Sequence, residues 1–265
     1  MTRLFNQHEI RRCLCLDGDW EYAFPVEGTS MTIDDWDRGA KEALPVPGVW
    51  EMLSSRATYH GQALARKVFQ ASQDGPVRLV FKGVSHTATV YLDGREVGRH
   101  HNAFTPFAID IPALSAGEHE LMLHISNEHG AISALHKPND YYNYGGISRP
   151  VEVQFLQSPL FVRHVHVVTE QDGDAWRARL VAVLRNLGAE TTAAMRVTLA
   201  DASIETGALH CPSGDTEVEL DLAPTGINAW SPDSPTLYLL DARVQQDGAV
   251  IDDWRDRIGF RTVNV

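Results

Sequence analysis

Short runs in which apolar and polar residues alternate recur along the whole chain. In HELMLHI, residues 119–125, Leu121, Leu123 and Ile125 fall on one face, and EVELDL, residues 217–222, repeats the pattern. Because successive side chains of a β-strand point to opposite faces, each run predicts a half-buried strand. Patterns with the helical period are nearly absent, so we predict an all-β protein.

Turn signals separate these runs and favour antiparallel pairing. Asp93-Gly94 stands between TVYL and REVG. Both residues tolerate the positive φ angles of a type I′ turn, which predicts a two-residue hairpin. Further signals follow at intervals of about ten to fifteen residues, in SAGEH, EQDGD, RNLGAE and QQDGA. This spacing is typical of antiparallel sandwiches.

The length of 265 residues is sufficient for two ordinary domains. Ser158-Pro159, in QSPL, separates the strand pattern PVEVQF from FVRHVHVVT and marks the expected boundary. We therefore expect a first domain over residues 1–158 and a second over residues 159–265. The second has the size of an immunoglobulin-like β-sandwich of about 100 residues, and the first suits a larger sandwich such as a jelly roll.

The charge balance restricts the partners. A formal net charge of −12, without a local cluster of Lys and Arg, repels phosphate groups, so we expect no nucleic acid and no membrane partner. A neutral ligand meets no such barrier. The N-terminal residues MTRLFNQHEIRR lack the apolar core of a signal peptide, and no run of about 18 apolar residues occurs. On this basis we expect a cytoplasmic location.

No cofactor and no metal site is predicted. Cys13, Cys15 and Cys211 are odd in number and include no CxxC pair, so they indicate neither a disulfide framework nor a thiolate zinc site. We expect buried free thiols. His164 and His166 would share one face of a strand, but a zinc site needs more ligands than two. A site for a hard cation held by loop oxygens stays possible, because the oxygen ligands of such a site follow no fixed spacing in the sequence.

The segment DYYNYGGISR, residues 140–149, combines three tyrosines, two glycines, an acid and a base where neither a regular helix nor a strand is expected. A carboxylate accepts hydrogen bonds from two sugar hydroxyls, tyrosine rings offer apolar area with a polar tip, and paired glycines permit a tight bend. This composition suits a polyol ligand. The alternative, which we favour for the tyrosines and for Arg149, is that the rings pack between domains and the arginine tethers a carbonyl or an acid.

Seven segments carry a family pattern in the family's order. They are LDGDWEYAF, LPVPGVWEM, YHGQALARKVFQ, residues 77–111, DYYNYGGISRPVEV, WSPDSPTLYLLDARV and RIGFRTV. The first five resemble the sugar-binding domain that opens enzymes of glycoside hydrolase family 2, the β-galactosidases and β-glucuronidases. The last two resemble that family's immunoglobulin-like domain. The resemblance implies a jelly-roll (galactose-binding-like) β-sandwich followed by an immunoglobulin-like β-sandwich.

In this family, catalysis resides in a (β/α)8 barrel of about 250 residues that follows the immunoglobulin-like domain, and this chain ends at Val265, where the barrel would begin. The resemblance therefore implies a non-catalytic N-terminal region that braces the missing C-terminal barrel and holds no catalytic residue. The parent reaction would be hydrolysis of a terminal β-linked sugar with retention. The motifs look closer to the β-glucuronidase and short β-galactosidase branches. A homo-oligomer stays open.

The family's loop motif matches this sequence residue by residue. The positions that fit are Asp140, Asn143, Tyr144, Gly146, Ile147 and Arg149. The resemblance implies that Asp140 contacts sugar hydroxyls and that Asn143 and Tyr144 lie in the sugar-facing loop. For Arg149 we keep the structural role, because arginines mostly tether. One charged hydrogen bond contributes about 1.5–3 kcal/mol, so we expect the chain alone to bind a β-linked carbohydrate weakly.

Other interpretations stay open at this point. Glu128, in SNEHG, resembles the Asn-Glu pair of the family's acid/base carboxylate, but it follows a sandwich strand, and no segment matches a second carboxylate. We therefore expect no turnover by this chain. Alternatively, the chain is a free-standing carbohydrate-binding module or a structural scaffold domain.

Overall fold

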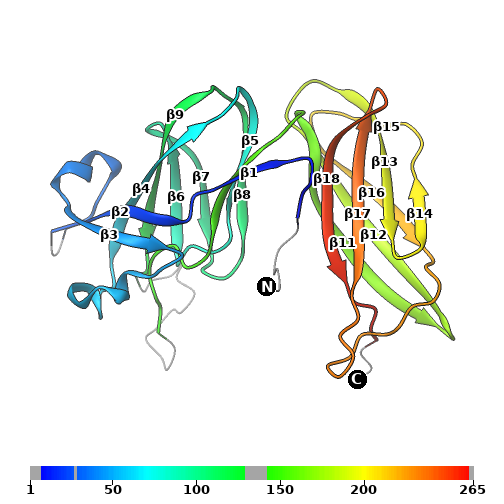
Figure 1. The fold of residues 1–265 in the computed structure, drawn as a ribbon. Helices are drawn as coiled ribbons and strands as arrows, with labels where there is room; N and C mark the ends of the chain where they lie inside the picture. Colours follow the sequence, from blue (N-terminus) through cyan, green and yellow to red (C-terminus); the bar gives the residue numbers. More distant parts are fainter. Residues whose placement is uncertain (1–6, 27–28, 129–141, 263–265) are drawn as a thin grey trace. The chain divides into compact units, whose positions relative to one another are not determined.

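The computed structural model describes residues 7–26, 29–128 and 142–262, and it is built from antiparallel strands with three short 3₁₀ helices (Figure 1). The all-β prediction is confirmed. The chain divides into two compact units, Cys13–Phe155 and a second that joins Met1–Arg12 to Leu156–Val265. The division after Phe155 lies three residues before the boundary expected at Ser158, and the second unit begins with N-terminal residues that the sequence assigned to the first.

The first unit packs two sheets face to face. The smaller sheet has the strand order β1 (Arg12–Cys15), β10 (Val151–Phe155), β5 (Gly75–Phe81) and β8 (Phe107–Leu114). The larger has the order β3 (Ala40–Val46), β2 (Gly18–Phe24), β4 (Gln62–Ala71), β9 (Gly117–Ser126), β6 (Thr87–Leu92) and β7 (Arg95–His101). The 3₁₀ helices are η1 (Ile33–Arg38), η2 (Trp50–Met52) and η3 (Ser54–Arg56).

The core of this unit lies between the two sheets, as the alternation predicts. Leu121, Leu123 and Ile125 of β9 are fully buried, and so are Trp20 and Trp50. The indole N–H of Trp20 donates to the carbonyl of Leu16 at 2.7 Å, so the polar end of the ring is satisfied inside the core. These large rings fix the position of the chain that leaves β3.

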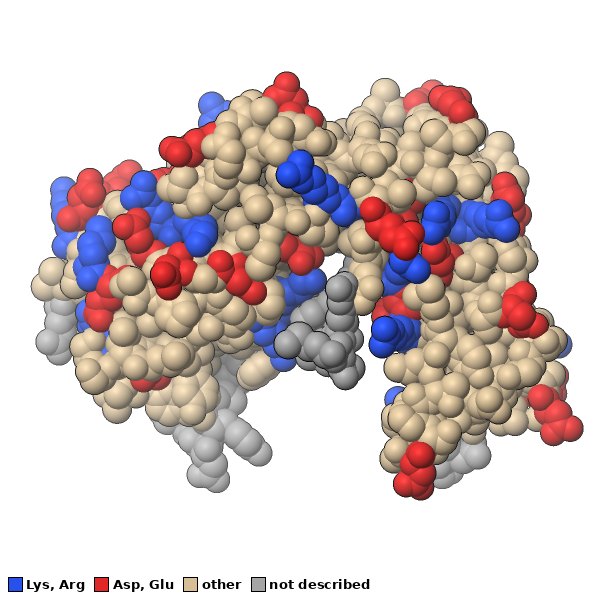
Figure 2. All heavy atoms as spheres, viewed as in Figure 1, with Lys and Arg blue, Asp and Glu red and all other residues tan. Residues whose placement is uncertain are grey.

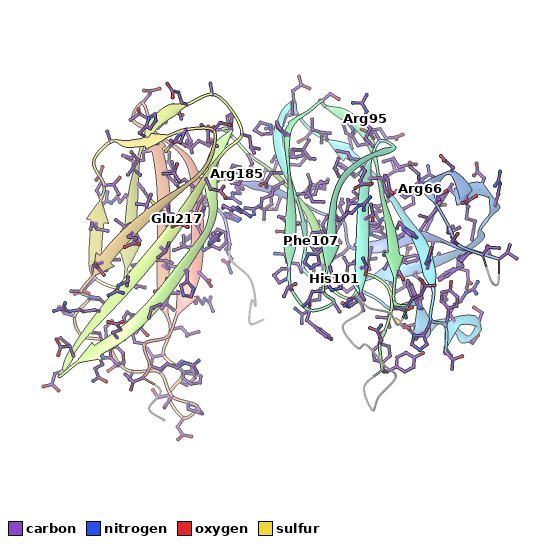
Figure 3. All side chains as sticks on the ribbon, turned by 180° about the vertical axis from the view of Figure 1, so that it is seen from behind. Arg66, Arg95, His101, Phe107, Arg185 and Glu217 are labelled. Carbon is purple, nitrogen blue, oxygen red and sulfur yellow. The ribbon has the colours of Figure 1, made fainter. Side chains whose placement is uncertain are left out.

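The predicted hairpin at Asp93-Gly94 is confirmed. It joins β6 to β7, with Leu92 paired to Arg95. Asp93 has a φ angle of 50° and Gly94 one of 76°, the left-handed pair that a type I′ turn requires. Figure 3 shows Arg95 at this hairpin end of β7 and His101 at the opposite end, where the candidate site lies.

The second unit is the immunoglobulin-like sandwich. One sheet has the order β11 (Leu160–Asp172), β12 (Ala175–Asn186) and β16 (Gly214–Leu222). The other has the order β14 (Ala202–Glu205), β13 (Thr191–Leu199), β17 (Tyr238–Gln246) and β18 (Ala249–Ile258), and β15 (Leu209–Cys211) pairs with β13. Glu217 and Arg185, labelled in Figure 3, stand on β16 and β12, and Val218, the neighbour of Glu217, is buried in the core.

Residues 7–11 form a clasp on the second unit, and we call them the N-terminal clasp. Gln7 and Arg255 of β18 exchange two backbone hydrogen bonds of 2.7 and 2.9 Å. The carboxylate of Asp253 accepts from the backbone amides of Glu9 and Ile10 at 2.7 and 2.9 Å. Asp253 is fully buried, so these donors replace the water that the carboxylate loses.

A buried ion pair completes the clasp. Arg11 donates to Asp252 from Nε at 2.7 Å and from Nη2 at 2.8 Å, and the exposed fractions of the two side chains are 1% and 2%. The backbone of Val162 bonds both partners of the ion pair. Its amide donates to Asp252 at 2.7 Å, and its carbonyl accepts from Arg11. The pair therefore joins the N-terminal residues, β11 and β18.

The prediction of buried thiols is right for Cys211 and wrong for Cys13 and Cys15, which are exposed. Both exposed cysteines lie on β1, an edge strand, where Leu14 between them packs against the core and the alternation turns both thiols outward.

Acidic and basic side chains are interspersed on the face of the first unit that Figure 2 shows. Within the described residues, no helix has the length and apolarity needed to cross a bilayer.

Candidate functional site

The candidate site is the end of the first unit where residues 142–149 return toward β10. Four backbone hydrogen bonds fix residues 145–147 of this segment. Ser85 and Gly146 exchange bonds of 2.9 and 3.2 Å, Gly48 donates to Ile147 at 2.8 Å, and Trp50 donates to Gly145 at 3.0 Å. Residues 145–147 are consequently held as firmly as a strand, although they lie outside the main sheets.

The residues predicted for this site have different environments. Asp140 lies outside the described residues. Asn143 is buried, with an exposed fraction of 5%, whereas Tyr144 is 53% exposed. Arg149 is exposed and donates from Nη1 to the carbonyl of Phe104 at 3.4 Å. Of the predicted site residues that the structure describes, Tyr144 and Arg149 are therefore accessible to a ligand, and Asn143 is a structural part of the segment.

Two asparagines hold the segment to the end of β9. The Asn143 side chain donates to the carbonyl of Asn127 at 2.8 Å, and the Asn127 side chain donates to the carbonyl of Asn143 at 2.9 Å. The side-chain oxygen of Asn127 accepts from the amide of Gly61 at 2.8 Å. Asn127 is fully buried, so its bonds are made in a low dielectric and are correspondingly strong.

Glu51 provides a charged anchor for the same segment. The amide of Gly145 donates to both carboxylate oxygens of Glu51, at 3.0 and 3.2 Å, and the Asn127 side chain donates to Oε1 at 3.3 Å. Desolvation by partial burial outweighs these hydrogen bonds and raises the pKa of Glu51 to about 6. Glu51 is thus a carboxyl group that titrates near neutral pH and contacts the loop directly.

Gly145 is required at its position by the ring of Trp50. A Cβ atom on Gly145 would lie 1.8 Å from Cζ2 of Trp50, and Trp50 is fully buried and packed against Phe24 and Tyr59. The backbone of the loop therefore approaches the indole closely at Gly145. No larger residue fits without displacing either the loop or the tryptophan.

Aromatic side chains face outward from this base. The rings of Tyr142 and Tyr144 lie 4.8 Å apart, and the ring of His60 lies 5.1 Å from that of Tyr142. The hydroxyl of Tyr142 donates to the carbonyl of Ala57 at 3.2 Å. Tyr142 and Tyr144 have exposed fractions of 41% and 53%, so part of each side chain is accessible to a ligand. Exposed tyrosines with one polar tip each are suited to the mixed surface of a sugar.

Glu128 lies close to the asparagine pair but has a different environment from Glu51. Its Oε2 accepts from Nε2 of Gln62 at 3.0 Å and from the hydroxyl of Ser126 at 3.2 Å. Across residues 7–26, 29–128 and 142–262, no three His, Cys, Asp or Glu side chains gather as a possible metal site.

Sequence reasoning missed the residues that build the base of the site. Trp50, Glu51 and Asn127 carry no motif of their own. Glu51 is separated from its partner Gly145 by 94 residues, and Asn127 from its partner Asn143 by 16 residues. Trp50 and Glu51 lie in the family-like segment LPVPGVWEM, and Asn127 precedes Glu128 in SNEHG. Nothing in either segment indicates that these residues meet.

The titration of Glu51 gives a pH-dependent prediction. The folded state holds the proton more tightly than an exposed carboxyl does, so Glu51 opposes folding above its pKa of about 6 and this opposition fades as the pH falls toward the ordinary value of 4.5. Glu51→Gln keeps an oxygen for Gly145 and Asn127 but cannot titrate. We expect the free energy of unfolding of this variant, relative to that of the native chain, to decrease from pH 7 to pH 5.

Urea unfolding of both proteins at the two pH values measures this difference. Hydrogen exchange of the amides of residues 142–147 shows whether the effect is located at the loop. Glu51→Ala is the informative companion, because it leaves the amide of Gly145 unpaired and should be destabilising at both pH values, by about 1–3 kcal/mol. A stability difference between Glu51→Gln and the native chain that does not change with pH would show that Glu51 does not titrate in this range.

Two family models match the chain. "Glycosyl hydrolase 2 galactose-binding domain-like" matches residues 52–175, which include residues 142–149 of the site, and "Glycosyl hydrolases family 2" matches residues 160–261. Among curated proteins, the β-galactosidase BgaC of Bifidobacterium adolescentis is 32% identical over 215 residues, which are 72% of this chain and 20% of that protein. A putative β-glucuronidase of Formosa agariphila is 22% identical over 69% of this chain and 23% of its own length.

Among solved structures, a β-galacturonidase from Eisenbergiella tayi bound to galacturonate aligns with a TM-score of 0.83 and 34% identity. The alignment covers 100% of this chain and 46% of that enzyme. The chain therefore spans about a fifth of the length of these curated relatives and less than half of this solved structure, and it corresponds to the N-terminal part of these enzymes.

Proposed function

Since the chain belongs to glycosyl hydrolase family 2, as two models of that family that together extend from residue 52 to residue 261 show, we propose that residues 140–149 contact the sugar bound by a β-glycosidase. The chain matches the non-catalytic N-terminal region of such enzymes. In the proposed arrangement, the two sandwiches brace a catalytic barrel, and the barrel contributes the two carboxylates that hydrolysis requires.

The observation that supports this proposal is the construction of the loop. Its base is rigid, because Glu51, Asn127 and Trp50 hold residues 143–147 through hydrogen bonds and ring contact. Its outer surface presents Tyr142 and Tyr144. A rigid base with exposed aromatic side chains is the design expected for a group that positions a ligand, because little ordering entropy is then lost on binding.

Each residue of the motif then has a separate role. Asp140 supplies the charged acceptor for sugar hydroxyls, and Tyr144 supplies ring surface. Asn143, whose side chain is directed inward to Asn127, acts by positioning the segment and not by direct contact. Arg149 ties the end of the loop to the carbonyl of Phe104. For the substrate class we favour a terminal β-linked galactose or uronic acid, because the relatives at 32% and 34% identity are a β-galactosidase and a β-galacturonidase.

The test of this proposal is kinetic and needs the barrel. In a polypeptide that carries this chain together with its catalytic barrel, we expect Asp140→Asn to lower kcat/KM by about 10- to 150-fold, the equivalent of one charged hydrogen bond of about 1.5–3 kcal/mol. Asp34→Asn, an exposed acid of η1 far along the sequence from the loop, is the matched control and should leave kcat/KM unchanged. Equal kcat/KM values for Asp140→Asn and the native enzyme would remove the proposed sugar contact.

A further inference from the structure

A groove in the first unit lies beside the loop and is used by no part of the proposed function. It has a volume of about 680 Å³, which is within the usual range of about 300–1,000 Å³ for small-molecule sites. Its walls are the end of β2, η3 and the chain that leads into β4. The lining residues are Pro25, Val26, Thr29, Ser30, Ser55, Arg56, Thr58, Tyr59, His60, Gly61, Gln62 and Glu128.

The chemistry of the lining selects a class of ligand. Five hydroxyl side chains, one of them the phenol of Tyr59, line the groove together with one amide and one imidazole, and its two charged residues, Arg56 and Glu128, have opposite signs. An anionic ligand such as a phosphate would need several cations, and an apolar ligand would need apolar walls beyond Pro25 and Val26. The lining fits a neutral, hydroxyl-rich molecule that both donates and accepts hydrogen bonds.

The two charged groups are fixed before any ligand arrives. Arg56 donates from Nε to Glu42 at 3.1 Å, and its guanidinium carbon lies 4.3 Å from the ring centroid of Phe24. The carboxylate of Glu128 is held by Gln62 and Ser126. Because these long side chains are already ordered, a ligand that contacts them loses less conformational entropy on binding.

The groove adjoins the aromatic face of the loop. His60 lines the groove and its ring contacts that of Tyr142 at 5.1 Å. The hydroxyl of Tyr142 donates to the carbonyl of Ala57, which stands between the lining residues Arg56 and Thr58. His60 and Ala57 thus place the groove next to the tyrosine face, within reach of a ligand that extends beyond it.

We propose that this groove binds the inner units of a β-linked oligosaccharide whose terminal unit lies at the face of Tyr142 and Tyr144. The choice of a glycan rests on the proposed function, whereas the groove and its lining do not. The parent enzyme would then act on extended glycans, and this chain would supply the affinity for the units beyond the one that is cleaved.

NMR titration of the 265-residue chain tests the proposal, with β-1,4-galactotetraose, cellotetraose, galactose and inorganic phosphate as probes. We expect one tetraose to shift the amides of residues 29–30, 55–62 and 128, with a Kd at least tenfold below that of galactose, and we expect phosphate to shift none of them. Glu128→Gln should weaken tetraose binding about tenfold, and Glu96→Gln, an exposed acid of β7 outside the groove, should not.

The outcomes separate the groove from the proposed function. If neither tetraose shifts the groove amides while Asp140→Asn lowers kcat/KM, the groove proposal is overturned and the loop proposal stands. If the tetraose binds and Asp140→Asn has no kinetic effect, the groove is a glycan site and the role of the loop is overturned. Phosphate binding at the groove amides would overturn the assignment to a neutral ligand.

Discussion

Replacing Arg11 by Met is expected to lower the free energy of unfolding of the second unit by about 3–5 kcal/mol, the usual effect of removing one partner from a buried ion pair. The reason is the environment of Asp252, whose side chain is 2% exposed and whose carboxylate would lose both bonds from Arg11. The carbonyl of Val162 would lose its donor as well. Only the amide of Val162 would still satisfy the carboxylate among the contacts described above.

Chemical unfolding followed by the fluorescence of Trp176 and Trp254, the tryptophans in the β-strands of this unit, measures the effect. Arg99→Met is the matched control, because Arg99 pairs with Glu96 with an exposed fraction of 71% and such pairs contribute little. The double variant Arg11→Met/Asp252→Leu should regain part of the loss, because it removes the isolated charge. A loss no larger than that of the control would mean that the N-terminal clasp does not hold the second unit together.

Replacing Gly145 by Ala is expected to be the most damaging single-methyl change in the first unit. The added Cβ would overlap the ring of Trp50 at 1.8 Å, and overpacking of this kind usually lowers stability by about 1–3 kcal/mol, or more where the surroundings are rigid. Trp50 has little room to yield, because its ring is fully buried against Phe24 and Tyr59. The loop should move instead, and the bond from its amide to Glu51 should lengthen or break.

Urea unfolding gives the loss of stability, and amide chemical shifts of residues 142–147 show whether the loop has moved. Gly207→Ala is the matched control, because Gly207 is exposed and a Cβ there meets no atom within 4 Å. Sugar contact should fail together with the loop geometry. If Gly145→Ala leaves both stability and these shifts unchanged, the close approach of the loop to Trp50 is not part of the folded protein in solution.

Local pattern was sufficient to predict the sandwiches. The alternation at Leu121, Leu123 and Ile125 gives a buried face in β9, and Asp93-Gly94 gives a left-handed pair of residues in the hairpin. Both signals act between near neighbours, for which side-chain direction and backbone freedom follow from residue type alone. The order of family segments adds the two-domain arrangement, which no single strand could reveal.

Contacts between distant segments were not predictable in the same way. Arg11 and Asp252 are separated by 241 residues, and Glu51 and Gly145 by 94. A single arginine or glutamate belongs to no repeating sequence pattern that would predict its burial. Whether it is buried depends on which strand comes to lie beside it in the fold. The exposure of Cys13 and Cys15 has the same origin, because it depends on β1 being an edge strand.

Turnover of chromogenic β-glycosides by the purified 265-residue chain decides whether these two sandwiches need a separate catalytic module. We expect no release of nitrophenol above buffer from the β-galactoside, the β-glucuronide or the β-galacturonide, because a glycosidase needs two carboxylates on either side of the bond. Among the described residues of this site, the carboxylates of Glu51 and Glu128 are engaged in holding Gly145 and Gln62, and the proposed role of Asp140 is to contact sugar hydroxyls. Release that Glu51→Gln or Glu128→Gln abolishes would place catalysis within this chain and contradict a non-catalytic role.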